Sequence, residues 1–155
     1  MRSSFLEQNS SASNWKSKVQ RVTADLTLVE ADSGKLLFVN PTAETTITLP
    51  SVAIVGFNVK VIATEDAASA DAGMNQVINV DMGSGSNLAN AGNIYEADGS
   101  TGGSAVANDD FVVMTAAATP GDTFEFWSDG QRWYVNGWVK DLSEADFSAN
   151  ATTIA

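Results

Sequence analysis

The sequence contains no cysteine and no histidine among its 155 residues. Without cysteine the chain has no disulfide framework, no thiolate metal site and no cysteine nucleophile. Without histidine it lacks the most common general base, the most common zinc ligand and the Ser–His pairing of nucleophilic catalysis. We therefore expect no enzymatic activity and no cofactor.

Long apolar runs are absent as well. No stretch approaches the roughly 20 apolar residues that a helix needs to cross a bilayer. The first 18 residues also have no continuous apolar core of the kind that a secretory signal contains. We expect a soluble protein that is made in a cytoplasm and has no membrane partner.

Positive charge is scarce and unevenly distributed. Residues 1–21 contain four cations against Glu7 alone, a net charge of +3, whereas the other 134 residues contain four cations and 18 acids, a net charge of −14. Between Val61 and Gln131 there is no lysine or arginine. Because such a surface repels a phosphate backbone, we expect no nucleic-acid partner for the body of the protein.

Short β-prone segments separated by Gly, Pro, Asn and Asp clusters indicate an all-β protein. This pattern is typical of a β-sandwich, here expected to be jelly-roll-like, with an extended N-terminal arm. The expected strands lie within residues 23–31, 34–40, 44–50, 56–64, 75–83, 109–117 and 122–140.

The predicted domain organisation has three parts. Residues 1–21 are rich in Ser and Asn and too short for a stable helix, which predicts an extended arm. Residues 22–140 form the β-sandwich, and residues 141–155 form a C-terminal tail in which 141–147 has a possible helix cap at Ser143. Residues 82–109, rich in Gly, Ala, Ser and Asn, predict a long surface loop with a short strand at 93–97.

The aromatic stretch 124–138, FEFWSDGQRWYVNGW, predicts a β-hairpin. The Asp129-Gly130 pair favours a two-residue type I′ turn, which sets Phe126 opposite Trp133 and Trp127 opposite Arg132. A four-residue loop keeps the same faces, whereas a three-residue loop separates the apolar set, which favours the first two alternatives. One face is then core and the other faces outward. The expected core residues are Phe124, Phe126, Trp133 and Val135, and the expected subunit interface consists of Trp127, Arg132, Tyr134 and Trp138.

The outward aromatics allow three interpretations. Partly covered aromatic faces are common in protein–protein interfaces, which is the interpretation we favour. A sugar platform is the second, and a nucleic-acid stacking platform the third, although the latter usually comes with a cationic groove. The acidic segments 96–100 and 107–110 offer oxygen ligands for Ca²⁺, but they lack the spacing of an EF-hand loop and are interpreted as solvated turns.

Three segments carry a resemblance to a known family: ADSGKLLFV (31–39), TITLP (46–50) with Gly56 after it, and GDTFEFWSDGQRWYV (121–135). Together with their surroundings they cover roughly 90 residues. In this order they resemble the small β-domains of tailed-phage virion modules, which include capsid decoration (cement) proteins, head fibres and tail-fibre segments. The resemblance implies a structural virion protein that binds the capsid exterior as a homotrimer and bridges major capsid proteins.

On this interpretation the basic arm holds the capsid, since a segment without fixed structure can order over a large surface. Its expected capsid-binding residues are Phe5, Leu6, Trp15, Lys16, Lys18 and Arg21. The first alternative is a head-fibre or tail-fibre domain that binds host glycan. The second is a wall-degrading hydrolase with two acidic catalysts in one cleft.

Overall fold

The computed structural model describes residues 18–41, 43–64, 77–83, 92–97, 101–104 and 109–148. These residues form twelve strands joined by turns and short 3₁₀ helices, which confirms the all-β class. The strands are β1 (Val19–Val22), β2 (Leu26–Thr27), β3 (Lys35–Val39), β4 (Thr45–Thr48), β5 (Asn58–Ala63), β6 (Ile78–Asp81), β7 (Gly92–Glu96), β8 (Thr101–Ser104), β9 (Phe111–Met114), β10 (Thr123–Ser128), β11 (Trp133–Val139) and β12 (Ala145–Ser148).

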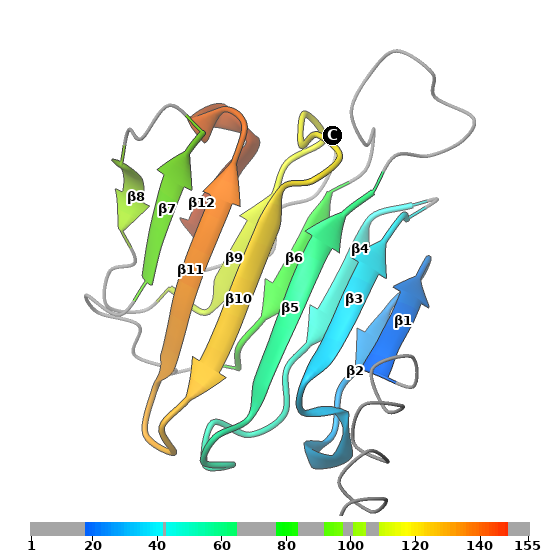
Figure 1. Ribbon diagram of the computed structural model, residues 1–155, viewed down its shortest axis with the longest axis vertical. Helices are drawn as coiled ribbons and strands as arrows, with labels where there is room; N and C mark the ends of the chain where they lie inside the picture. The colour runs from blue at the N-terminus through cyan, green and yellow to red at the C-terminus, as the bar shows by residue number, and fades with distance from the viewer. Residues whose placement is uncertain are drawn as a thin grey trace, which may run out of the picture.

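The strands form two mixed sheets. The larger has the order β1-β3-β5-β10-β11-β7-β8 and the smaller the order β12-β9-β6-β4-β2. Figure 1 shows the seven-stranded sheet in front and the five-stranded sheet behind it. Residues of both sheets contribute to one hydrophobic core, so the inner faces of the two sheets pack against each other.

The first six strands alternate between the two sheets along the chain. As a result β1, β3 and β5 are parallel neighbours in one sheet, and β2, β4 and β6 are parallel neighbours in the other. This is the winding of a solenoid, in which each turn adds one strand to each sheet. It departs from the jelly-roll connectivity that we expected, because a jelly roll consists of antiparallel Greek keys.

The last strands close the core with antiparallel pairs. The β10–β11 hairpin adds to β5, while β9 adds to β6 and β12 to β9. The strand expected at 93–97 is present as β7 and lies parallel to β11. The possible helix at 141–147 is instead the 3₁₀ helix η3 (Leu142–Glu144) followed directly by β12.

Both predicted domain boundaries differ from the sheets. Residues 19–21, assigned to the arm, belong to β1 and pair with β3, so the sheet begins before residue 22. Residues 145–148, assigned to the tail, belong to β12 and pair with β9. Each of these strands has only four residues, which is too few for the sequence to show a pattern of alternating buried and exposed positions. The hydrogen bonds that make each one a strand come from the neighbouring strand.

Gly137 illustrates how tightly the inner face of the hairpin is packed. It lies directly opposite Phe124 on the neighbouring strand, and both residues point into the core. A Cβ atom at position 137 would lie 2.3 Å from Cε1 of Phe124, whose side chain is fully buried. The ring therefore occupies the space that a side chain at 137 would need.

We expect Gly137→Ala to destabilise the fold by about 1–3 kcal/mol, the usual cost of overpacking a well-filled core. Urea unfolding measures this change in the free energy of unfolding. The control is Asn136→Ala on the partly exposed side of the same strand, expected to change the free energy by less than about 0.5 kcal/mol. Equal stability of the two variants would contradict the close approach of Phe124 to Gly137.

Candidate functional site

The candidate site is the side of the seven-stranded sheet that faces away from the smaller sheet, called the outer face below. Strand alternation places every second residue of β1, β3, β5, β10, β11 and β7 there, and the registers align them into rows. The outer-face residues are Val19, Arg21, Leu36, Phe38, Asn58, Lys60, Ile62, Asn93, Tyr95, Thr123, Glu125, Trp127, Tyr134, Asn136 and Trp138.

The outer face has few carboxylates although the body of the protein is strongly acidic, and its charged residues are Arg21, Lys60 and Glu125. Glu125 is its only carboxylate among the described strand residues, and the Lys60 ammonium lies 2.9 Å from it. Aliphatic and aromatic side chains make up about half of the face. Scarcity of carboxylates together with enrichment in Trp and Tyr matches the composition of protein–protein interfaces.

The hairpin that supplies most of the aromatics has a four-residue loop, so the two-residue turn is wrong. Phe126 lies opposite Val135 and Trp127 opposite Tyr134. The reason is that the Asp129 carboxylate accepts hydrogen bonds from the N–H groups of Gln131 and Arg132, at 2.8 and 2.9 Å. This side-chain-capped turn holds 129–132 outside the ladder.

Both alternatives had predicted the same faces, and the structure confirms them. The expected core side chains Phe124, Phe126, Trp133 and Val135 are each at most 1% exposed. Trp127, Tyr134 and Trp138 are exposed by 38, 42 and 54%. Arg132 does not lie opposite Trp127, because it belongs to the loop.

Two hydrogen-bonded or stacked pairs hold the outward aromatics in place. The rings of Tyr95 and Trp138 stack with centroids 4.9 Å apart. The Tyr134 hydroxyl donates to Oδ2 of Asp129 at 2.9 Å. The N–H of Arg132, the N–H of Gln131 and this hydroxyl lower the pKa of Asp129, and the same bond to Asp129 raises the pKa of Tyr134.

The outer face is hollowed between β3, β5 and β10. This depression has a volume of about 370 Å³, and the ion pair of Lys60 and Glu125 lies within its lining. The apolar part of the lining comes from both sides of that pair, and Gly34 forms one end. The lining includes Gly34, Leu36, Asn58, Lys60, Ile62, Glu125 and Trp127.

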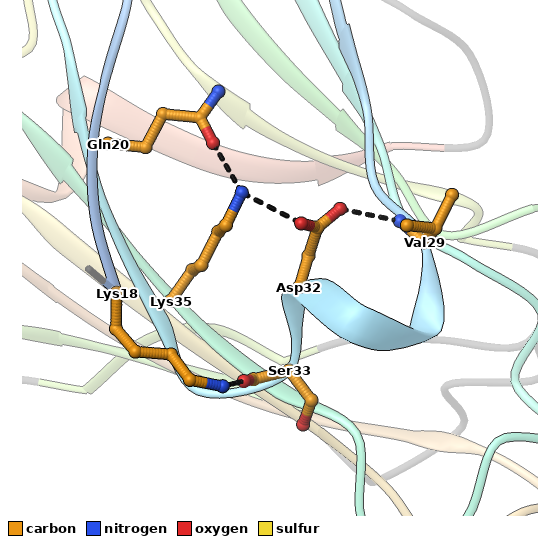
Figure 2. Close-up of polar contacts among 6 residues, drawn as sticks. All are labelled: Lys18, Gln20, Val29, Asp32, Ser33 and Lys35. Carbon is orange, nitrogen blue, oxygen red and sulfur yellow. Dashed lines mark hydrogen bonds and ion pairs between the residues drawn. The ribbon is translucent and has the colours of Figure 1, made fainter. Parts of the chain in front are cut away.

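The expected capsid-binding residues fall into two groups. Phe5, Leu6, Trp15 and Lys16 lie outside the described residues. Arg21 is exposed on β1 beside Phe38, whereas the Lys18 ammonium donates a hydrogen bond to the Ser33 carbonyl (Figure 2). Lys18 therefore fastens the start of β1 to the turn that precedes β3.

A polar network around Asp32, which the sequence analysis did not find, holds the same edge of the sheet (Figure 2). Asp32 accepts a hydrogen bond from the Val29 N–H at 2.8 Å and lies 2.7 Å from the Lys35 ammonium. Lys35 also donates to Gln20 of β1 at 2.6 Å. The Asp-Ser-Gly-Lys order was the available signal, since it combines a turn with an i,i+3 ion pair.

Within the described part of the chain, no three Asp or Glu side chains gather closely enough to hold a metal ion. The same residues include no helix that is long and apolar enough to span a membrane. Of the segments considered for Ca²⁺, residues 98–100 and 107–108 lie outside the described residues.

Comparison with known proteins adds no family to this description. No model of a protein family matches the chain, and no curated protein matches its sequence.

Asp32 leads to a prediction about pH. The hydrogen bond from Lys35 and then that from Val29 lower the pKa of Asp32 below its ordinary value of 3.8. The carboxylate therefore contributes stability that is complete above the unfolded-state value and is lost as the pH falls through the lower folded-state value. We expect wild type to be more stable than Asp32→Asn at neutral pH, with the difference shrinking below about pH 4.

Urea unfolding of both proteins between pH 2.5 and 7 measures that difference. Glu30→Gln, which removes an exposed carboxylate from the same turn, is the control and should track wild type. A difference between wild type and Asp32→Asn that stays constant across this range would refute the role of the Asp32 charge.

Proposed function

We propose that this chain is a structural virion protein, a phage capsid decoration (cement) protein that binds the outer surface of the shell as a homotrimer. It is made in the host cytoplasm and ends on the capsid exterior, where it bridges neighbouring major capsid proteins. The partners are thus the major capsid protein and further copies of the chain. The activity is binding, with no catalytic step.

The observation that carries the proposal is the outer face, an aromatic surface with one carboxylate on an acidic body. A sheet face that exposes Trp127, Tyr134 and Trp138 together has the composition of a protein–protein contact. We assign these three residues, with Arg132 beside them, to the contact between subunits. The resemblance of segments 31–39, 46–50 and 121–135 to phage virion β-domains indicates which kind of assembly the contact serves.

Reinforcement of a shell follows from simple linkage. A protein that binds the assembled shell and not its separated subunits stabilises the shell by mass action. A trimer presents three capsid-binding elements at once, so contacts that are individually weak give a high combined affinity. We assign these elements to the N-terminal arm, with Phe5, Leu6 and Trp15 as apolar anchors and Arg2 and Lys16 as cations.

One observation favours a second candidate, a head-fibre or tail-fibre domain that binds host glycan. Trp138, stacked on Tyr95, borders a second depression of about 390 Å³ that also includes Pro120 and Lys140. An exposed indole held flat by a neighbouring ring offers an apolar body with a polar N–H at its edge. We rank this candidate second because the indole also fits the proposed subunit contact.

The subunit contact predicts that the mass of the particle depends on the outer aromatics. We expect wild type to be a trimer and Trp127→Ala/Trp138→Ala to dissociate, because central aromatic residues each typically contribute about 2 kcal/mol or more. Light scattering over a concentration series measures the mass. Val29→Ala removes an apolar side chain that is 55% exposed elsewhere and should leave the trimer intact. A monomeric wild type would exclude the homotrimer.

The arm predicts a separable loss of capsid binding. Deletion of residues 2–17 ends before Lys18 and β1, so the body should still fold and form a trimer. Co-sedimentation with purified capsids should fall to background. Wild-type binding should weaken as the salt concentration rises, and a charge-only variant, Arg2→Gln/Lys16→Gln, should bind more weakly at low salt with a smaller dependence on salt. Full binding by the deletion would exclude the arm as the capsid-binding element.

The glycan candidate is tested on the same proteins. A glycan array that gives hits with wild type and none with Trp138→Ala would favour the fibre domain over the decoration protein. Absence of hits, together with saturable binding to capsids, would favour the decoration protein.

A further inference from the structure

The outer face has an aliphatic half that meets the proposed subunit contact at Trp127. Leu36 of β3 and Ile62 of β5 lie there, on the side of the sheet toward the β1 edge. The depression opens between them and Trp127, and it is therefore lined by apolar groups around the ion pair of Lys60 and Glu125. An apolar hollow of this kind is suited to one large side chain that has an apolar body and a polar edge.

The chain enters the described structure at the rim of this depression. Val19 of β1 is paired with Leu36, which lines the hollow. Lys18 is fixed to the Ser33 carbonyl, and its Nζ lies 3.6 Å from the point where a Cβ on Gly34 would be. Gly34 also lines the hollow. Residues 1–17 therefore attach to the body directly beside this depression.

The nearest large apolar residue in that segment is Trp15, three residues before Lys18. Three residues of extended chain span at most about 10 Å, about the width of two neighbouring strands. From Lys18 the indole therefore reaches the hollow between β3 and β5 without strain. Phe5 and Leu6 are separated from Lys18 by ten or more residues, so the attachment point does not direct them to any one place.

We propose that in the free protein Trp15 docks into this depression of its own chain, against Leu36, Ile62 and Trp127. The docked indole lies beside the Lys60 ammonium, an arrangement in which a cation and an aromatic ring attract each other. The inference concerns the free chain and does not depend on the proposed capsid role.

The absence of cysteine makes the test specific, because a single introduced cysteine is the only site for a nitroxide label. Asn58→Cys places the label in the lining of the depression, and Asp146→Cys places it on an exposed residue of β12 in the other sheet. The four tryptophan indole N–H signals of ¹⁵N-labelled protein are assigned by single Trp→Phe variants. Each measurement is repeated after chemical reduction of the nitroxide.

We expect the label at position 58 to broaden the Trp15 signal strongly and the label at position 146 to leave it sharp. A sample that mixes ¹⁵N protein without a label and labelled protein without ¹⁵N should show no broadening of Trp15. Broadening of Trp15 in the mixed sample as well would place Trp15 on a neighbouring copy and overturn the proposal. A Trp15 signal that is unaffected by either label, at the position found in a peptide of residues 1–17, would overturn it as well.

A second variant tests the docking site while a buried tryptophan reports whether the fold is retained. Leu36→Asp should shift the Trp15 signal to its position in the free peptide, because the hollow then loses an apolar wall and gains a charged side chain. The Trp133 signal should not move, since that indole is buried and donates to the Met82 carbonyl. The matched substitution Thr46→Asp on β4, in the other sheet, should leave both signals in place. Retention of the docked Trp15 signal in Leu36→Asp would refute the proposed site.

Discussion

The indole of Trp133 is the contact on which the two-sheet arrangement depends. It belongs to β11 of the larger sheet, is fully buried and packs edge-on against Phe57 with ring centroids 5.8 Å apart. Its N–H donates across the core to the carbonyl of Met82, which follows β6 of the smaller sheet, at 3.2 Å. The largest core side chain thus satisfies its one polar group on the opposite layer, which fixes the depth and the register of the packing.

The winding of the first six strands determines which surface remains open. Because successive strands alternate between the sheets, each sheet grows by parallel neighbours, and each inner face is covered by the other sheet. The outer face of the larger sheet receives no such cover from the described residues. Its scarcity of carboxylates and its exposed aromatic residues are features of a surface that another molecule or another part of the chain covers.

The two proposed roles fall on neighbouring parts of this surface and meet at Trp127. The aromatic half lies on β10, β11 and β7, far along the sheet from β1, and suits a contact between subunits. The aliphatic half lies beside the point where residues 1–17 attach, and suits Trp15. The network of Lys18, Asp32 and Lys35 anchors the start of β1 whatever residues precede it. The folding of this edge of the sheet is therefore independent of the proposed roles.

The sequence by itself determined the all-β class, the β10–β11 hairpin and its two faces, because a period of two in a strand assigns each residue to one side whatever the loop length. It also determined the absence of cysteine and histidine chemistry. Only the tertiary structure decided the parallel winding, the membership of residues 19–21 and 145–148 in the sheets, and the four-residue loop capped by Asp129. The sequence carries no periodic signal for the pairing of strands that are distant along the chain. It carries none either for a side chain that binds the backbone of its own loop. The depression has the same origin, since Leu36, Lys60 and Trp127 become neighbours only when three strands from distant parts of the chain are paired.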